Sequence, residues 1–128
     1  MSLVDTVALR EVAVTEYADI VVGVLLSGPN ETRIFLKDGS FVDIWFSLKL
    51  AGRYSYHWER QAIDGTVYRH DNAPHSRWRS VRTFPAHFHD GDEGRVSESD
   101  LSPVPADALR QFLAFVRNRM TALAENRQ

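Results

Sequence analysis

The sequence predicts an α+β domain in which a meandering antiparallel β-sheet of about five to six strands packs against one long C-terminal helix. Two observations lead to this prediction. Short β-branched and aromatic runs alternate with tight-turn signals in the first part of the chain, and a helical spacing of apolar residues follows near its end. A length of 128 residues without an evident linker suits a single domain, which we expect to span residues 1–128.

The expected elements follow one another in a regular order. Residues 5–17 have a mixed periodicity that is compatible with a short N-terminal helix, although their β-branched content disfavours one. The dipeptides Asp38-Gly39 and Asp64-Gly65 are typical of the tight turns in hairpins, so we expect two hairpins. The runs that predict strands are residues 19–27, 32–37, 41–47, 53–61 and 66–71.

The strand expected at residues 53–61 has two unlike faces, because successive side chains of a strand point to opposite sides. Aromatic side chains on one face favour the core beneath a helix, since one face of such a sheet has to be covered. The polar side chains are then left on the opposite face. The aromatic face carries Tyr54, Tyr56 and Trp58, and the polar face carries Ser55, His57 and Glu59.

Beyond residue 71 the strand pattern breaks and a helix ends the chain. Pro74 and Pro85 interrupt the pattern, a short extended piece is expected at residues 81–84, and residues 90–94 predict a solvated acidic turn. Pro105 suits the first turn of a helix, where its missing N–H costs nothing. The apolar residues that then recur at helical spacing are Leu109, Phe112, Leu113, Val116, Met120 and Leu123.

The composition excludes several classes of function. Without cysteine the chain has no disulfide framework, thiolate zinc site, iron–sulfur cluster or cysteine nucleophile. No apolar run approaches the roughly 20 residues that span a bilayer, so we expect no membrane contact. The N-terminus lacks the basic-then-apolar pattern of a secretory signal, and we therefore expect a cytoplasmic protein.

The formal net charge of −2 conceals a basic middle segment. Residues 53–89 hold six arginines, three acidic residues and all five histidines, whereas both flanking segments are net acidic. A GC-rich genome explains an excess of arginine over lysine, but it does not explain the clustering of the histidines. Because the whole chain is close to neutral, any contact with RNA is expected to be local to residues 53–89.

Three motifs in this segment resemble those of a known family. They are Tyr54-Ser55-Tyr56-His57-Trp58, Tyr68-Arg69-His70-Asp71-Asn72-Ala73-Pro74-His75 and Thr83-Phe84-Pro85-Ala86-His87-Phe88-His89. In this order they are similar to the TumE-type family of small bacterial and archaeal toxins of toxin–antitoxin pairs, over about residues 32–120. Ser76 stands where the family pattern has a second histidine and Phe88 where it has a basic residue, so no family role is transferred to these two positions.

The resemblance implies a toxin that acts on RNA or on translation. It also implies a small helix-turn-helix antitoxin protein as partner, with RNA as the second expected partner. Our main hypothesis assigns no cofactor. A homodimer is compatible with the sequence.

The histidine spacing itself suits RNA cleavage. His87 and His89 are two residues apart, so both imidazoles point the same way on an extended segment. In metal-independent cleavage one histidine takes the proton of a 2′-hydroxyl, another protonates the leaving oxygen, and arginine stabilises the phosphorane. We therefore expect a histidine-dependent ribonuclease. Its catalytic candidates are His57, His75, His87 and His89, and its substrate-binding candidates are Arg69, Asp71, Asn72, Arg77 and Arg79.

Two other functions stay open. The same spacing occurs in strand-borne metal sites, which His57, His75 or Asp71 would complete, so a metal-dependent enzyme is one alternative. A non-catalytic protein-binding module is the other, because the chain has no P-loop, nucleophile elbow or HExxH motif. In that case residues 71–75 form only an Asx-type turn, and Trp78 anchors the loop that follows.

Overall fold

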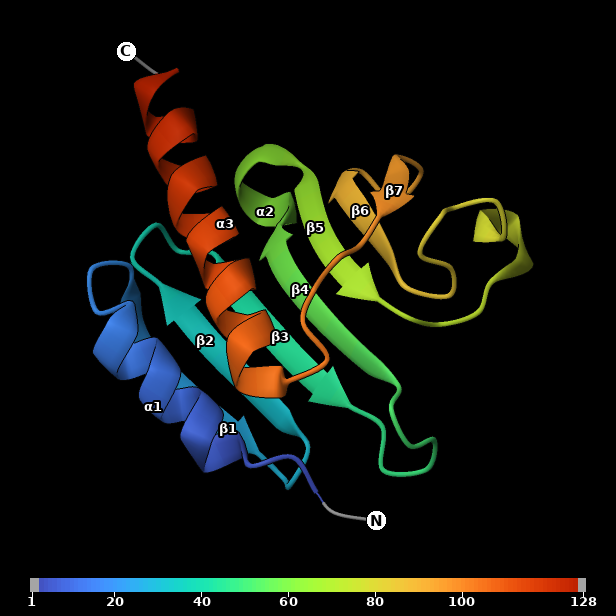
Figure 1. Ribbon diagram of the computed structural model, residues 1–128. Helices are drawn as coiled ribbons and strands as arrows, with labels where there is room; N and C mark the ends of the chain where they lie inside the picture. The colour runs from blue at the N-terminus through green and yellow to red at the C-terminus, as the bar shows by residue number, and fades with distance from the viewer. Residues whose placement is uncertain (1–2, 127–128) are drawn as a thin grey trace.

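Within residues 3–126, the part of the chain described by the computed structural model, seven strands form one antiparallel sheet (Figure 1). Each strand pairs with its neighbour in the sequence, so the sheet is a simple meander. The strands are β1 (Val21–Ser27), β2 (Glu31–Leu36), β3 (Phe41–Phe46), β4 (Tyr54–Arg60), β5 (Thr66–Asp71), β6 (His87–Gly91) and β7 (Val96–Glu98). The helices are α1 (Thr6–Glu16), α2 (Gln61–Asp64), the 3₁₀ turn η1 (Ser76–Trp78) and α3 (Pro105–Glu125).

The predicted α+β class and the meandering sheet are confirmed, and so are the short N-terminal helix and the long C-terminal one. Seven strands are present where about five to six were expected. The additional pairing is between β6 and β7, where residues 90–94 form the turn of a third hairpin. Because β7 is only three residues long, its sequence carries little strand signal.

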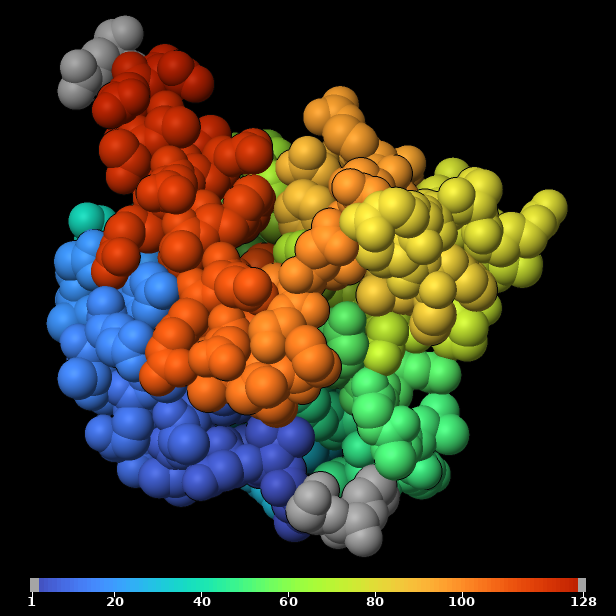
Figure 2. All heavy atoms as spheres, in the orientation of Figure 1, coloured from blue at the N-terminus to red at the C-terminus, as the bar shows by residue number. Residues whose placement is uncertain are grey.

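Helices α1 and α3 lie side by side over one face of the sheet (Figures 1 and 2). The Tyr17 hydroxyl donates to the backbone carbonyl of Arg110 at 2.8 Å, and the Arg110 guanidinium in turn pairs with Glu16. Arg117 pairs with Asp19 just before β1. These contacts join the two ends of the chain across the same face, so neither α1 nor α3 covers the opposite face of the sheet.

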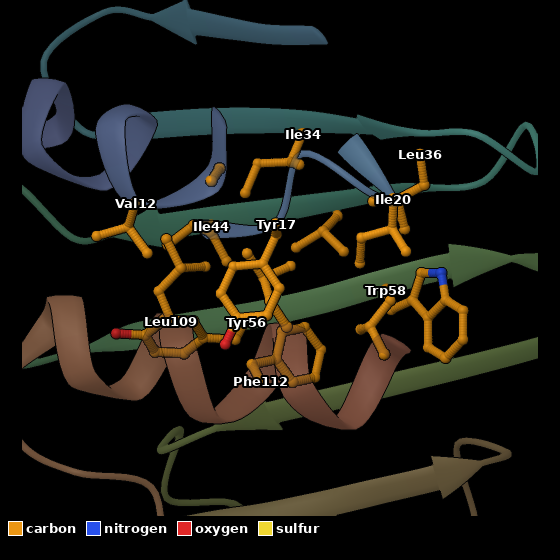
Figure 3. Packing of buried hydrophobic residues seen from close by; sticks show 14 of the residues in the cluster. Val12, Tyr17, Ile20, Ile34, Leu36, Ile44, Tyr56, Trp58, Leu109 and Phe112 are labelled. Atoms are coloured by element: carbon orange, nitrogen blue, oxygen red, sulfur yellow. The ribbon is translucent and has the colours of Figure 1, made fainter. Parts of the chain in front are cut away.

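The core lies between this helical layer and the sheet (Figure 3). Phe112 of α3 is fully buried, and its ring centre lies 6.2 Å from that of Tyr56 on β4. Trp58 is equally buried and stacks on Tyr68 with ring centres 5.0 Å apart. The aromatic face of β4 therefore points into the core as predicted, and its polar face points to the uncovered side.

One local prediction is wrong. No extended piece occurs at residues 81–84, because successive turns close there, with the amide of Val81 donating to the carbonyl of Trp78 and that of Phe84 to Val81. The second predicted hairpin is confirmed, with Asp64-Gly65 at the end of the connection between β4 and β5. The chain makes the single helical turn α2 before Gly65, which ends it with φ of 78°, a left-handed value that glycine adopts without strain.

The loop of residues 72–86 forms a lobe beside the segment that leads into α3 (Figure 2). Arg82 pairs with Glu98 and Asp100, and the Thr83 hydroxyl accepts from the amide of Ser99 at 2.8 Å. These contacts hold the loop against the chain that follows β7. Among residues 3–126 no helix is both long and apolar enough to cross a membrane.

His70 occupies the helical side of β5. Its ring stacks on Phe88 with centres 4.3 Å apart, meets Phe112 edge-on and contacts the Ser99 hydroxyl through Nδ1 at 2.6 Å. Burial lowers the pKa of His70 to about 4, and the nearby Asp71 carboxylate opposes this effect only in part. The folded protein therefore keeps this imidazole neutral at pH 5, where the unfolded chain is protonated.

We expect the free energy of unfolding to fall by about 2 kcal/mol between pH 7 and pH 5 because of His70 alone. The unfolded state binds the extra proton throughout the window between its ordinary pKa of 6.5 and the folded value of about 4, so stability falls as the pH falls. Urea unfolding at both pH values in EDTA measures the difference. In His70→Gln the difference shrinks by this amount, and an unchanged pH dependence would contradict the assignment.

Candidate functional site

The face of the sheet without helices carries two rows of polar side chains. Arg69 on β5 lies opposite His57 on one side and His89 on the other, and Asp71 lies opposite Ser55 and His87 in the next row. Side chains opposite one another on neighbouring strands lie within contact distance. The β5–β6 pairing therefore brings Asp71 to the two histidines of the Phe-Pro-x-His-x-His motif.

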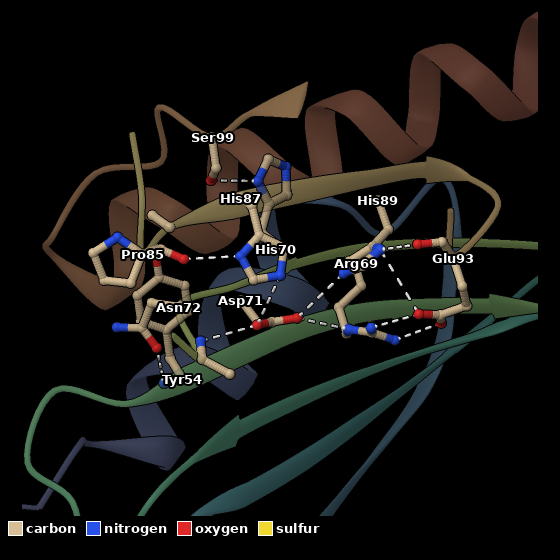
Figure 4. A network of polar contacts seen from close by, with 12 residues as sticks. Tyr54, Arg69, His70, Asp71, Asn72, Pro85, His87, His89, Glu93 and Ser99 are labelled. Atoms are coloured by element: carbon tan, nitrogen blue, oxygen red, sulfur yellow. Dashed lines mark hydrogen bonds and ion pairs between the residues drawn. The ribbon is translucent and has the colours of Figure 1, made fainter. Parts of the chain in front are cut away.

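Asp71, His87 and His89 form a buried cluster on this face (Figure 4). The three residues are only 8%, 1% and 3% exposed, respectively. His87 Nε2 lies 3.2 Å from Asp71 Oδ1, and His89 Nε2 lies 3.7 Å from Asp71 Oδ2. One ligand atom from each of the three residues lies within 4.8 Å of the others. Two imidazole nitrogens thus converge on one carboxylate.

Backbone carbonyls fix the orientation of both rings. His87 Nδ1 lies 2.8 Å from the carbonyl oxygen of Pro85, and His89 Nδ1 lies 2.8 Å from that of Glu93. A carbonyl oxygen only accepts, so each Nδ1 carries the proton and donates it. In the neutral ring each Nε2 then has a free lone pair that points toward Asp71. Burial lowers the pKa of His89, which favours its neutral form.

The Asp71 carboxylate is held by its own set of donors. Arg69 Nε donates to Oδ2 at 2.9 Å, and the amide of Ala73 donates to Oδ1 at 3.0 Å in the predicted Asx-type turn. Arg69 also forms a two-bond pair with Glu93, both bonds being 2.7 Å long. This pairing lowers the pKa of Glu93. Residues 90–94 are therefore more than a solvated turn, because they hold both Arg69 and His89.

Trp78 closes the cluster from the loop side. Its ring centre lies 6.3 Å from that of His87 and 5.9 Å from that of His89, and the Arg77 guanidinium lies over the ring at 4.6 Å from its centre. The expected role of Trp78 as an apolar anchor agrees with this packing, but the surface it anchors to is the histidine pair. This contact explains why His87 is buried on a face that no helix covers.

A groove of about 570 Å³ opens in front of the cluster, with Asp71 and His89 in its lining. His75 and Trp78 form part of its wall on the loop side, and Arg53 and Arg77 contribute two guanidinium groups. Within residues 3–126 neither Arg53 nor Arg77 forms an ion pair. The groove thus combines uncompensated positive charge, aromatic surface and a buried histidine–carboxylate cluster.

The structure places most of the predicted site residues at this groove. The predicted residues that line it are Arg69, Asp71, His75, Arg77 and His89. His87 lies beneath it and contacts Asp71. Asn72 is a structural link, since its Oδ1 accepts from the amide of Tyr54 at 2.9 Å and its Nδ2 donates to the carbonyl of Gly52 at 2.8 Å.

Besides His87 and Asn72, two further predicted residues lie outside the groove lining. His57 is in contact with Glu59 instead, with 3.0 Å between its Nε2 and the Glu59 Oε1. Arg79 is exposed and donates to the carbonyl of Ser76 at 2.8 Å. Both belong to the basic, histidine-rich segment, but neither faces the cluster.

Eight residues that line the groove were not predicted as site residues: Trp45, Arg53, Tyr54, Ser55, Ala73, Trp78, Glu93 and Gly94. The alternation of polar and aromatic side chains along β4 could have pointed to Trp45, since Trp45 lies opposite Ser55 and shares its polar face. No sequence signal points to Glu93, because its role depends on the β6–β7 hairpin.

Comparison with known proteins identifies the family. A family model described as "Toxin TumE" matches residues 8–120. The chain belongs to the TumE toxin family. The match begins at residue 8 instead of near 32, so α1 and β1 are part of the TumE region as well. Curated proteins give no match to the chain, and neither do solved structures.

The TumE family is a family of toxins, and membership of it implies in general that the protein has an antitoxin partner. All three motifs that resemble the family lie within the matched residues. They supply part of the groove lining and the whole cluster, with Asp71 from the second motif and His87 and His89 from the third.

Proposed function

We propose that this TumE-family toxin cleaves RNA in the groove in front of Asp71 and His89. The observation that carries the proposal is that one groove brings together an aromatic wall, the Asp71–His87–His89 cluster and two arginines that form no ion pair within residues 3–126. Family membership supports the toxin part of the proposal, and the chemistry of the groove supports RNA as its target. The proposal places the protein in the cytoplasm, together with RNA.

The groove offers the two kinds of contact that single-stranded RNA needs. Arg53 and Arg77 present planar donors suited to phosphate oxygens, and they are not neutralised by carboxylates within residues 3–126. Trp45 and Trp78 present aromatic surface in the groove on which unpaired bases can stack. Arg69 has a different role, because Asp71 and Glu93 already occupy its donors.

The proposed reaction is an internal transfer at phosphorus. The cluster at the floor takes the proton of a 2′-hydroxyl, whose oxygen then bonds to the adjacent phosphorus. The bond from phosphorus to the 5′-oxygen breaks, and a protonated His75 at the wall gives its proton to that oxygen. The products are a 2′,3′-cyclic phosphate and a free 5′-hydroxyl. His57 and Arg79 have no contact with RNA in this scheme, since they lie outside the groove.

The proposed partner is a small helix-turn-helix antitoxin that neutralises the toxin. Family membership supports an antitoxin, and the resemblance of the motifs supports this type of partner. Co-expression with such an antitoxin is expected to relieve growth arrest. Arrest that no co-expressed helix-turn-helix protein from the same operon relieves would contradict this part of the proposal.

Changing Arg53 and Arg77 together to glutamine is expected to weaken binding of single-stranded RNA and to reduce its salt dependence. Each lost phosphate contact lowers the slope of log K against log salt by about 0.7. Fluorescence anisotropy with a labelled oligonucleotide at several salt concentrations measures both effects.

The matched control for this experiment is the double change of Arg10 and Arg33 to glutamine. It removes the same charge but lies on α1 and on β2, away from the groove. Equal losses in the two double variants would mean that only net charge matters. No binding of RNA by the unchanged protein would favour the non-catalytic protein-binding module instead.

A further inference from the structure

We infer that Asp71, His87 and His89 bind one divalent transition-metal ion, with zinc as the best fit. Two neutral imidazoles and one carboxylate are a common set of three protein ligands for zinc, which leaves a further position for water. The same set also suits other divalent metals of the first transition row, so the site is selective for this class of cation and not for zinc alone. The chain has no cysteine, and nitrogen and oxygen are therefore the strongest donors available to it.

The strongest evidence is a buried nitrogen without a partner. His87 Nε2 makes no hydrogen bond although its side chain is 1% exposed. It lies 3.2 Å from Asp71 Oδ1, but its ring proton is on Nδ1, where the carbonyl of Pro85 accepts it. In the neutral ring, a lone pair on nitrogen thus faces a lone pair on oxygen. Such a contact is repulsive unless a cation lies between the two atoms.

A proton on one ring does not satisfy the whole cluster. His89 repeats the arrangement, with Nδ1 donating to the carbonyl of Glu93 and Nε2 directed at Asp71 Oδ2 from 3.7 Å. A single proton between His87 and Asp71 leaves His89 Nε2, at the lining of the groove, without a hydrogen-bond partner among residues 3–126. One metal ion accepts both nitrogen lone pairs and one carboxylate oxygen together.

The distances agree with a metal ion in the middle. Zinc bonds of about 2.0–2.1 Å at tetrahedral angles place neighbouring ligand atoms about 3.4 Å apart. The observed separations of 3.2 Å and 3.7 Å from His87 and His89 to the two Asp71 oxygens bracket this value. No ligand atom of the three is more than 4.8 Å from another, so small rotations of the side chains complete the coordination.

The surroundings match those of a metal site. Metal-bound histidines almost always donate their other N–H to a carbonyl or carboxylate, as His87 and His89 both do. The carboxylate ligand is itself held by hydrogen bonds from Arg69 and the amide of Ala73. Glu93 pairs with Arg69 and offsets its charge. Asp71, Arg69 and Glu93 together therefore carry a charge of −1, which favours a cation between the ligands.

The metal site adds to the proposed function, and a catalytic role of the metal rests on the proposed cleavage of RNA. Asp71 and His89 also line the groove, so an ion held by Asp71, His87 and His89 would be accessible from the groove. When bound, such an ion would lower the pKa of a coordinated water and so supply a base for the 2′-hydroxyl proton. Metal binding itself does not depend on RNA and is tested without it.

Zinc titration of the untagged full chain, stripped with EDTA and desalted, tests the inference. Isothermal titration calorimetry and competition with a coloured chelator measure affinity and stoichiometry, and Co²⁺ adds visible absorption bands that report tetrahedral coordination. We expect one ion per chain. Asp71→Asn and His89→Gln are each expected to weaken binding by at least about 100-fold, since loss of a second-shell partner alone costs about 10- to 100-fold.

Two matched variants serve as controls. Asp43→Asn makes the same change on the same face of the sheet, and His70→Gln makes it at a buried histidine on the opposite face. Both are expected to bind zinc like the unchanged protein. No stoichiometric binding of Zn²⁺, Co²⁺, Mn²⁺ or Ni²⁺, or equal binding by all four variants, would overturn the inference. Zinc binding without RNA cleavage would instead overturn the proposed function alone.

Discussion

Asp71→Asn is expected to abolish growth arrest when the toxin is expressed in cells. The change keeps the size of the side chain and the oxygen that accepts from the amide of Ala73, but it replaces the oxygen that accepts from Arg69 Nε. Arg69 keeps its two-bond pair with Glu93, so the fold is expected to survive. It removes the charge toward which both histidine Nε2 atoms point. Loss of a group that moves the reacting proton typically costs about 10²- to 10⁴-fold in rate.

Asp43→Asn is the control for this experiment. Asp43 is also a carboxylate on the uncovered face and pairs with Arg33 at 2.8 Å, but it lies outside the groove. Colony counts after induction, with western blots to confirm equal expression, compare the two variants. Arrest by Asp43→Asn and survival with Asp71→Asn is the expected pattern. Full arrest by Asp71→Asn would show that the cluster is not the centre of the activity.

The largest expected effect on stability is that of Phe112→Ala, which is predicted to cost about 3–5 kcal/mol of the free energy of unfolding. Phe112 is fully buried in α3 and contacts Tyr56, His70 and Phe115 through its ring. Removing the ring leaves a cavity between the helix and the centre of the sheet. Because total stabilities are about 5–15 kcal/mol, this change alone brings the protein close to unfolding.

Thr121→Ala on the same helix is the matched control. Its side chain is exposed and donates only to the carbonyl of Arg117 one turn earlier, so we expect a change within about 0.5 kcal/mol. Urea unfolding followed by circular dichroism measures both variants at pH 7. A loss below about 1 kcal/mol for Phe112→Ala would mean that α3 does not cover the sheet as described.

Local patterns predict much of this fold. The alternation in β4 assigns Tyr56 and Trp58 to the core and His57 to the other face, as observed. The apolar spacing from Leu109 to Met120 identifies the helix that covers this core. Both patterns are periodic within a single element, and such patterns are visible in one sequence.

The composition of the site depends on pairings that a single sequence does not reveal. The spacing of His87 and His89 predicts that they share a face, but only the β5–β6 register adds Asp71 to them. His57 is also a histidine on this face of the sheet, yet the register places Arg69 between His57 and His89. The turns of residues 79–85 also escape local patterns, because Arg82 and Thr83 fix them through contacts with the chain beyond β7.

The central claim is that the Asp71–His87–His89 cluster cleaves RNA in the groove. The most direct measurement is the incubation of single-stranded RNA with the purified protein, His89→Gln and His70→Gln, followed by analysis of the RNA ends. The account predicts 2′,3′-cyclic phosphate ends with the unchanged protein and with His70→Gln, and intact RNA with folded His89→Gln. Equal cleavage by all three proteins, or intact RNA with all three, would contradict it.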